Sequence, residues 1–476
     1  MKAKDFLISS ALLPIAACQV NTEDNPNVVI IYIDDMGYAD LSCYGQTKWS
    51  TPNIDNLANE GIRFTDAYSA SPVSSPSRAA LLTGRYSSRM GIQAVFNPDS
   101  YTGIPQKELL IPELMKSKKY STGIIGKWHL GTREKHLPLQ NGFDEYFGIP
   151  YSNDMSAQVY LRWNEVEEFH IDQSQMTKKY TNEAKDFISR HKNKPFFLYL
   201  AHNMMHVPIF CSDEFKGKSG AGVYGDAVME IDWSVGEVIS ELNRQGILEN
   251  TLIIFASDNG PWLQEGPLGG EAFPLREGKT TAYEGGVRIP TIVYWKGKIA
   301  PAVRNDVIST LDWFPTIANL CNMEIPKNIR LDGYDLSDLL LHNGQRASNT
   351  YAYFADNKLA TGLRVGDWKI SLPRPAIRGN FWRASTAAHD TLLFNLKDDP
   401  SETTNLFYKY PEKAKEMTKA LETYKAEFGD IPPALVMGGN HQLDDLRRQR
   451  RDAIDNAIKN GIQSKENQVD GFIEMQ

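Results

Sequence analysis

The chain has 476 residues, of which 41% are hydrophobic and 23% are charged, and this is the composition of an ordinary globular protein. Its length predicts one large domain and a smaller one. The net charge of −8 comes without a basic stripe, which argues against nucleic acid as a partner. The densest group of arginines, at 447–451, is interleaved with aspartates, so we interpret it as the solvated face of a helix.

The first 18 residues have the pattern of an export signal. In MKAKDFLISSALLPIAAC, two lysines precede an apolar run too short to span a bilayer, and small residues precede Cys18. A cysteine at this place resembles the lipidated first residue of a bacterial lipoprotein, with residues 19–26 as a polar tether. A plain secretory signal with an incidental cysteine is the alternative. We expect an exported protein of a Gram-negative bacterium, periplasmic or on the outer-membrane surface, that meets the membrane through its lipid anchor only.

Four apolar runs predict the strands of the main sheet. Residues 28–33, 196–201 and 252–256 are apolar throughout, and a fourth run precedes Lys127 and His129. Runs without alternation are typical of strands buried on both faces, as in a parallel sheet. Helical spacing at 228–242 places a helix between two of them, so the expected fold is α/β with a doubly wound, mostly parallel sheet. Ligands of such sheets bind at the carboxyl ends of strands, where all four runs give way to polar residues.

The stretch SPVSSPSRAALLTGRY, at 71–86, predicts a further helix. Ser75 is expected as its N-cap and Pro76 as its first helical residue, followed by the apolar body at 79–82. A helix start alone does not account for Arg78 or for the Thr-Gly-Arg that ends the stretch.

The sequence changes in character from about residue 349. Aromatic and β-branched residues with turn signals predict a small antiparallel sheet that carries one helix at 410–428. Cys43, Cys211 and Cys321 match no metal motif and are expected to be buried thiols. No later segment is long and apolar enough to cross a bilayer. The expected divisions after the leader are a main domain at 27–345, a C-terminal subdomain at 346–432 and a polar extension at 433–476.

Two polar pairs that follow predicted strands offer oxygen ligands only. They are Asp34-Asp35 and Asp258-Asn259, and three of the four side chains are carboxylates. Hard divalent cations, Ca²⁺ or Mg²⁺, prefer such ligands. The alternative is that these residues only form loop turns and helix caps.

Basic side chains accompany these acids. Lys127, His129, His206, Lys279 and Arg78 together could hold a tetrahedral oxyanion and protonate a leaving group. A nearby histidine at 202 is expected to be structural and to pack behind His206.

One motif carries a family resemblance. Residues 74–78 read Ser-Ser-Pro-Ser-Arg and are followed by Leu-Thr-Gly-Arg at 82–85; GKWHLG, ASDNG and GKTTAYEGGVRIP come later in order. With these motifs the chain resembles the type I sulfatases of the alkaline-phosphatase superfamily, in particular the group of arylsulfatase A and N-acetylgalactosamine-6-sulfatase. The resemblance covers about residues 27–428.

The resemblance implies that Ser74 is oxidised to formylglycine, whose hydrate is the nucleophile. A plain serine would leave a sulfated enzyme with no easy exit, whereas the geminal diol expels sulfate by collapsing to the aldehyde. Serine instead of cysteine at this position resembles the bacterial form, which a separate anaerobic maturase converts. That maturase is therefore an expected partner.

The resemblance also implies a role for each site residue. Asp34, Asp35, Asp258 and Asn259, with the group made from Ser74, match the metal ligands, and Ca²⁺ is expected rather than Mg²⁺. Arg78 would stabilise the modified residue, Lys127 and Lys279 would grip the sulfate oxygens, and His129 would take the proton of the hydrate. His206 would protonate the departing oxygen. Ser152 matches a serine that contacts sulfate.

The function expected from the resemblance is removal of sulfate from a carbohydrate, of galactose or N-acetylgalactosamine type. Alternatives are an aryl or alkyl sulfatase, a phosphodiesterase or phosphonate hydrolase on the same fold, and a glycan-binding lipoprotein without activity. Four candidate substrate contacts in the C-terminal subdomain, Arg378, Trp382, Arg383 and His389, could equally belong to a solvated loop. The candidate substrate contacts are Asn153, Asp154, Arg378, Trp382, Arg383 and His389.

Overall fold

The computed structural model describes residues 25–155, 158–355, 358–379 and 385–435. The predicted leader with Cys18, most of the tether, Trp382 and Arg383, and nearly all of the extension after 433 lie outside the described residues.

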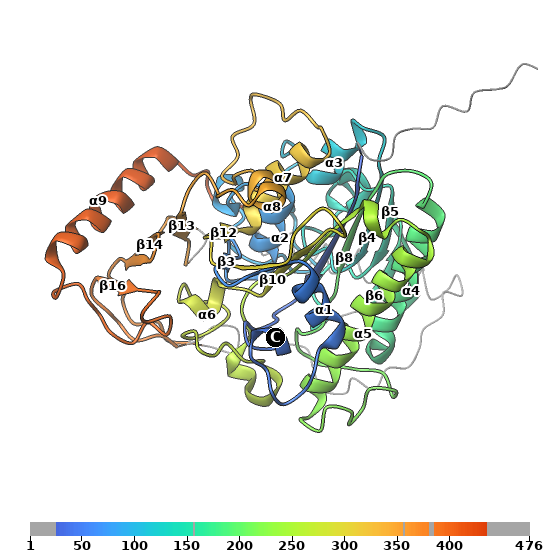
Figure 1. Cartoon of the computed structure of the whole chain (residues 1–476), viewed down its shortest axis with the longest axis horizontal. Coiled ribbons are helices and arrows are strands. Elements are labelled where there is room, and N and C mark those ends of the chain that lie inside the picture. Colours follow the sequence, from blue (N-terminus) through green and yellow to red (C-terminus); the bar gives the residue numbers. More distant parts are fainter. Residues whose placement is uncertain (1–24, 156–157, 356–357, 380–384, 436–476) are drawn as a thin grey trace, which may run out of the picture.

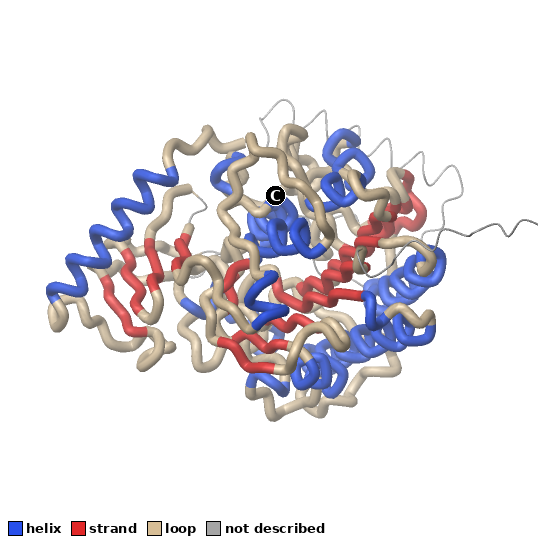
Figure 2. Tube along the Cα trace, turned by 45° about the horizontal axis from the view of Figure 1, so that its top comes forward, coloured by secondary structure: helices blue, strands red, loops and turns tan. Residues whose placement is uncertain are grey.

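A mixed sheet of ten strands forms the centre of the molecule (Figures 1 and 2). Its middle strands β9, β1, β8, β4 and β5 run parallel to one another, as predicted for a doubly wound fold. In spatial order the strands are β11 (Ala302–Arg304), β2 (Ile62–Phe64), β10 (Thr291–Tyr294), β9 (Thr251–Ser257), β1 (Asn27–Ile33), β8 (Phe196–Ala201), β4 (Ser121–Gly126), β5 (Glu145–Gly148), β6 (Val159–Arg162) and β7 (Glu165–Phe169).

Helices cover both faces of this sheet, which explains why its central strands are apolar without alternation (Figure 2). One layer holds α1 (Pro52–Glu60), α4 (Met176–His191) and α5 (Val223–Arg244). The other holds α2 (Ser74–Thr83), α3 (Ile111–Lys116), α7 (Trp313–Leu320) and α8 (Ser337–His342). The helix predicted at 228–242 is confirmed as the main part of α5. A short helix α6 (Glu284–Val287) and a two-stranded pair of β3 (Ala67–Tyr68) with β12 (Ile308–Ser309) complete this part.

The predicted start of α2 is wrong by two residues. The helix begins at Ser74 with Val73 as its N-cap, and no side chain caps it. Ser75 is instead inside the helix, and its hydroxyl accepts a hydrogen bond from the backbone of Phe96 at 3.0 Å. A neighbouring loop uses the hydroxyl that would otherwise cap the helix, so local propensity placed the boundary too late.

The C-terminal part forms a separate small sheet, as predicted (Figure 1, left). Helix α9 (Pro411–Phe428) packs on β14 and β15 through Ala414, Met417 and Leu421, which are buried. The four antiparallel strands are β13 (Thr350–Tyr353), β14 (Gly362–Val365), β15 (Trp368–Ser371) and β16 (Leu392–Asn395).

A buried ionic cluster joins this small sheet to the rest of the molecule. Lys369 of β15 is fully buried and lies 3.0 Å from Glu284 Oε1 and 2.7 Å from Glu402 Oε1. Its ammonium also donates to the carbonyl of Ala282 and lies 3.9 Å from the centre of the Tyr353 ring. Glu402 accepts from the backbone N–H of Glu284 at 2.7 Å. The small sheet therefore holds the loop that precedes α6 by main-chain and side-chain contacts.

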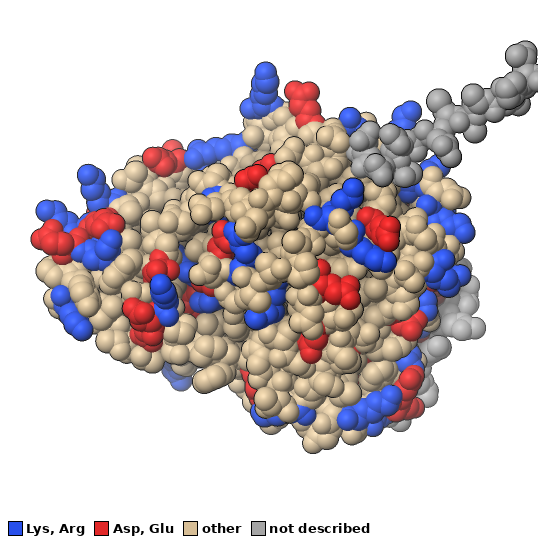
Figure 3. Space-filling model, in the orientation of Figure 1, with Lys and Arg blue, Asp and Glu red and all other residues tan. Residues whose placement is uncertain are grey.

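Charges of both signs alternate over the molecular face in Figure 3, and no single-sign field covers it. This agrees with the absence of a basic stripe in the sequence. Among the described residues, no helix has the length and apolar character needed to cross a membrane. The three described cysteines are free thiols; Cys211 and Cys321 are buried, as expected, and Cys43 is half-buried.

His202 directly follows β8 and is buried inside the main domain. Its Nε2 lies 3.2 Å from the hydroxyl of Ser234 on α5, and burial lowers the pKa of the imidazole to about 3. The ring is therefore neutral in the folded protein, as a structural histidine would be.

His202 makes folding stability depend on pH. Its folded pKa lies below the ordinary value of about 6.5, so the unfolded chain binds more protons, and stability falls as pH drops below 6.5 toward 3. Between pH 7 and pH 5 this group should cost about 2 kcal/mol of unfolding free energy. Denaturant unfolding at the two pH values should show that loss in the wild type and a smaller one in His202→Asn. An equal pH dependence of the two proteins would contradict the assignment.

Candidate active site

Four neighbouring parallel strands deliver the site residues to one edge of the sheet. In the order β9, β1, β8, β4, these strands end just before Asp258, Asp34, His202 and Lys127. Parallel strands that lie side by side bring their carboxyl ends together, so segments more than 200 residues apart meet here.

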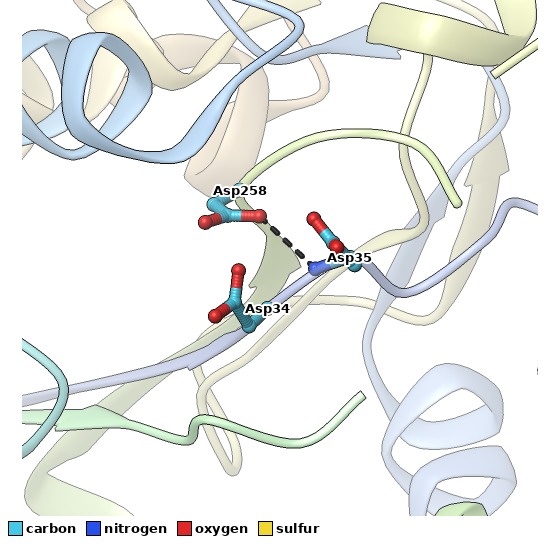
Figure 4. A group of neighbouring side chains, drawn as sticks. All are labelled: Asp34, Asp35 and Asp258. Atoms are coloured by element: carbon cyan, nitrogen blue, oxygen red, sulfur yellow. Dashed lines mark hydrogen bonds between the residues drawn. The ribbon is translucent and has the colours of Figure 1, made fainter. Parts of the chain in front are cut away.

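Three carboxylates form the centre of the site. Asp34, Asp35 and Asp258 each offer an oxygen, and these atoms lie within 4.8 Å of one another. Figure 4 shows the three side chains converging from the ends of two strands, with the Asp35 backbone N–H donating to Asp258 Oδ1 at 3.1 Å. All three are buried. Asn259 lies beside them and donates through Nδ2 to Asp35 Oδ1 at 2.7 Å.

Each carboxylate has its own cationic partner. Lys127 contacts Asp34 Oδ2, and Lys279 lies 2.7 Å from Asp35 Oδ2. Arg78 donates to Asp258 Oδ2 through Nη2 at 2.8 Å and Nε at 3.1 Å. These partners come from three different elements: the end of β4, the loop before α6 and the middle of α2.

The charges of the cluster shift its pKa values in opposite directions. Burial and the neighbouring Asp34 charge raise the pKa of Asp258 to about 7. Burial would also raise the pKa of Asp34, but Lys127, His206, Arg78 and Lys279 outweigh it and hold that pKa well below its ordinary value. Burial and the charge of Asp34 thus both favour the protonated form of Asp258, and a divalent cation between the two carboxylates would offset the repulsion between them.

The residues of this centre fit a hard divalent cation. Beside the three carboxylates, Asn259 Oδ1 is buried and has no hydrogen-bond partner among the described residues. A buried amide oxygen without a donor is costly, and an oxygen-seeking cation would satisfy it. The donor set contains oxygen only, which agrees with Ca²⁺ or Mg²⁺ and not with a softer metal.

Ser74 occupies the first turn of α2 and faces the acidic centre. Its hydroxyl donates to Asp34 Oδ1 at 3.0 Å, and its side chain is buried. Arg78 follows one helical turn later, so both side chains lie on the same helix face. Its guanidinium lies 3.6 Å from the same Asp34 oxygen. The Ser-x-Pro-x-Arg spacing of the sequence therefore places a hydroxyl and a cation on one carboxylate.

The two histidines of the site hold their protons on different atoms. His129 Nε2 donates to the carbonyl of Phe96 at 2.9 Å, which leaves Nδ1 as an acceptor with no partner among the described residues. Burial, then the charges of Lys127 and Arg78, lower the pKa of His129, so the ring is neutral and can accept a proton. His206 Nδ1 instead donates to the carbonyl of Val207 at 2.6 Å, and its Nε2 faces Asp35 Oδ2 at 3.8 Å.

Three predicted substrate contacts, at residues 152–154, lie next to Lys127 and His206. Ser152 accepts from Lys127 Nζ at 3.0 Å. Asn153 donates to the carbonyl of His206 at 3.3 Å and thereby holds the histidine loop. Asp154 Oδ1 is buried without a hydrogen-bond partner among the described residues and lies 3.9 Å from His206 Nδ1.

The remaining predicted substrate contacts belong to the C-terminal part. His389 is half-buried on a ribbon that pairs residues 374 and 377 with 389 and 386. Its ring meets Tyr283 at 6.3 Å, four residues after Lys279. Arg378 is exposed on the same ribbon. No contact between these two side chains and the acidic centre is present in the described part of the chain.

Two glycine-containing turns bring the Lys279 loop against the acidic loop. The backbone N–H of Gly260 donates to the carbonyl of Gly286 at 3.0 Å. A Cβ at position 260 would lie 1.7 Å from the carbonyl oxygen of Gly285, so no larger residue fits there without movement. The motifs DNG and EGG are therefore two halves of one contact.

The sequence analysis missed two residues that border the site. Trp262 is buried beside both His206 and Lys279. Glu265 lies on the next turn and interacts electrostatically with the same two residues; burial raises its pKa. Neither has a motif or a strand end to mark it, and only the short distance to ASDNG along the chain pointed to this segment.

Comparison with known proteins gives the family. The family model described as Sulfatase matches residues 26–323. Bovine (Bos taurus) arylsulfatase A is 37% identical over 85% of this chain and 88% of its own length. Mouse (Mus musculus) N-acetylgalactosamine-6-sulfatase is 41% identical over 77% of this chain and 75% of its own.

A solved structure agrees with the sequence relatives. The crystal structure of the PsFucS1 sulfatase from Pseudoalteromonas sp. superposes with a TM-score of 0.78 at 32% identity, over 86% of this chain and 92% of that one. The acidic centre, its cations and the serine of α2 thus lie in a chain whose relatives along most of its length are sulfatases. The chain belongs to the sulfatase family and is an enzyme that hydrolyses sulfate esters.

Proposed function

We propose that this sulfatase removes sulfate from a carbohydrate by means of a formylglycine made from Ser74. The observation that carries the proposal is the position of Ser74, whose buried hydroxyl lies 3.0 Å from Asp34 in the acidic centre. Oxidation of this CH₂OH group to an aldehyde removes two hydrogens. The hydrated aldehyde supplies a nucleophilic hydroxyl and a route for release of sulfate. A separate maturase would perform the oxidation.

Asp34, Asp35, Asp258 and Asn259 would hold the metal ion, together with the group at position 74. When bound, the ion polarises the sulfate ester and stabilises charge on its oxygens. Each of the three carboxylates offers an oxygen, and these oxygens lie within 4.8 Å of one another, which supports this role. Calcium is the ion we propose, since these ligands are all hard oxygens.

Cationic residues around the centre would hold the sulfate group. Lys127 and Lys279 each end within the acidic centre, and Ser152 is tied to Lys127 at 3.0 Å. The burial of both ammonium groups strengthens their attraction for developing negative charge. Arg78 would stabilise the modified side chain, because it already contacts two of the proposed metal ligands.

The histidines would move the two protons that the reaction needs. His129 is neutral and offers Nδ1 as an acceptor, which suits removal of a proton from the hydrate when sulfate leaves. His206 presents Nε2 at the Asp35 side of the centre, where its imidazolium form would donate the Nε2 proton to the departing sugar oxygen while Nδ1–H stays bonded to Val207. The backbone contact of its Nδ1 fixes the orientation of the ring.

A carbohydrate is favoured over an aryl ester by the acceptors beside His206. Asp154 has a buried oxygen that accepts no hydrogen bond from the described residues, and sugar hydroxyls would supply the donors. The similarity to N-acetylgalactosamine-6-sulfatase supports a sugar of galactose or N-acetylgalactosamine type. Residues of the C-terminal ribbon would add further contacts; they are Arg378, Trp382, Arg383 and His389.

The N-terminal sequence supports a location outside the cytoplasm. We propose that the chain is exported and anchored by lipid on Cys18, because a basic start, a short apolar run and small residues precede that cysteine. An exported position would give the enzyme access to sulfated glycans that do not enter the cell.

Asp154→Asn tests the preference for sugars. The variant should lower kcat/KM on N-acetylgalactosamine 6-sulfate by roughly tenfold, because a hydroxyl loses its charged acceptor. The rate on 4-nitrophenyl sulfate should stay within about twofold, since this leaving group has no hydroxyl to pair. Asp172→Asn, at an aspartate that caps a neighbouring turn, is the matched control. Equal losses on the two esters, or faster hydrolysis of 4-nitrophenyl phosphate than of the sulfate by the wild type, would contradict the proposal.

The mass of the peptide that contains Ser74 tests the modification. Protein purified from its native host should show a peptide lighter by two hydrogens at this residue. Ser74→Ala should lose roughly 10³-fold or more in kcat, because the nucleophile is gone. Ser75→Ala is the matched control and should keep its activity, since that hydroxyl accepts from the Phe96 backbone and points to no proposed catalytic group among the described residues. An unmodified Ser74 in active protein would rule out the turnover route described here.

Calcium titration tests the metal centre. Chelator-treated protein should bind Ca²⁺ by calorimetry, and an ion at hundredfold excess over its dissociation constant should add about 2.7 kcal/mol of stability. Asp258→Asn should weaken binding, because a charged ligand is lost. Asp226→Asn, at a buried aspartate that bonds the loop at 217–219, should leave it unchanged. Ca²⁺ affinity that is the same in Asp258→Asn and the wild type would place the ion elsewhere.

A further inference from the structure

Trp262 packs against His206, to which we assign protonation of the leaving group, and against Lys279, to which we assign part of the sulfate binding. Its ring centre is 5.4 Å from that of His206, and Lys279 Nζ lies 4.2 Å from the ring centre. The indole side chain follows the acidic loop directly and is only 2% exposed. The buried ring packs against both side chains.

His206 and Lys279 converge on one atom. His206 Nε2 is 3.8 Å and Lys279 Nζ is 2.7 Å from Asp35 Oδ2. Two cationic groups this close repel each other when both are charged, and each has a flexible or rotatable side chain. The face of an aromatic ring attracts an ammonium group and excludes water from it. Trp262 therefore supplies the apolar wall that keeps both groups at this position.

The backbone of this region is fixed independently of the indole. The N–H of Lys279 donates to the carbonyl of Pro261 at 2.9 Å, and Gly260 is bonded to Gly286. We therefore expect a substitution at Trp262 to change the apolar surface beside His206 and Lys279 and to leave the main-chain contacts between the acidic loop and the Lys279 loop in place.

We propose that Trp262 is a positioning residue that holds the His206 ring and the Lys279 ammonium so that both act on the same sulfate ester. The proposal rests on the proposed roles of His206 and Lys279. Loss of the indole removes a contact that orients the His206 ring together with the Nδ1 hydrogen bond to Val207, and it lets Lys279 bend away toward water. Without the indole, both the acceleration that comes from protonation of the leaving oxygen and the affinity for sulfate should decrease.

Two aryl sulfates that differ in their leaving group separate the effect of Trp262 on proton donation from its effect on sulfate binding. 4-Nitrophenolate leaves with little help from an acid, whereas phenolate from phenyl sulfate needs a proton more. In matured Trp262→Leu enzyme, we expect the ratio of kcat/KM for phenyl sulfate over 4-nitrophenyl sulfate to fall by roughly tenfold. Trp262→Phe keeps an aromatic face and should hold that ratio within about threefold of the wild type. In a His206→Ala background, Trp262→Leu should change the ratio no further.

Binding of inorganic sulfate measures the contribution of Lys279 to sulfate affinity without turnover. Calorimetry should show weaker sulfate binding in Trp262→Leu than in Trp262→Phe or the wild type, because only Leu removes the ring under Lys279. Thermal unfolding checks that each variant is folded, and Trp262→Met replaces the leucine variant if that one fails to fold.

An unchanged ratio of the two esters in folded Trp262→Leu would overturn the assigned effect on His206. Unchanged sulfate affinity would overturn the assigned effect on Lys279. Failure of the proposed roles has a different signature, because His206→Ala would then leave the ratio of the two esters unchanged and Lys279→Ala would leave sulfate affinity unchanged, whichever residue stands at position 262.

Discussion

Pairing of three buried carboxylates with three buried cations is the interaction on which the rest of the structure depends. Asp34, Asp35 and Asp258 repel one another, and a buried charge without a partner is very costly. Lys127, Lys279 and Arg78 offset that cost, one for each acid. Because the six residues come from five places in the chain, the centre exists only when both the sheet and helix α2 are assembled. The carboxylates still retain oxygens for a metal ion.

The small C-terminal sheet takes part in this arrangement at a distance. Lys369 and Glu402 fix Glu284, which lies five residues after Lys279, through contacts that are buried completely. At its other side the same loop rests on the acidic loop through the close approach of Gly260 to Gly285. Lys279, to which we assign sulfate binding, is thereby held from both sides, which would preorganise the site for charge that develops in the reaction.

Hydrogen bonds to backbone carbonyls assign the proton positions of the site before any substrate arrives. The Nε2–H of His129 donates to the carbonyl of Phe96 and leaves Nδ1 as an acceptor. The Nδ1–H of His206 donates to the carbonyl of Val207, and its Nε2 faces the centre. A carbonyl can only accept, so these contacts fix the tautomers. Trp262 adds an apolar wall against His206 and Lys279, and the two rings and the ammonium occupy one compact region beside Asp35.

The sequence alone determined four central strands of the sheet, helices α2, α5 and α9, and the candidate centre. Continuous apolar runs require burial on both faces, and parallel strands that end together bring Asp34, Asp35 and Asp258 to one edge. The helix of Ser74 and Arg78 was also predictable, although its start was placed too late because the Ser75 hydroxyl bonds to Phe96 instead of capping. Trp262, the histidine tautomers and the pairing of each acid with one cation were decided only by the tertiary structure. These depend on contacts between distant segments, and neither hydrophobic period nor local propensity carries information about such distances.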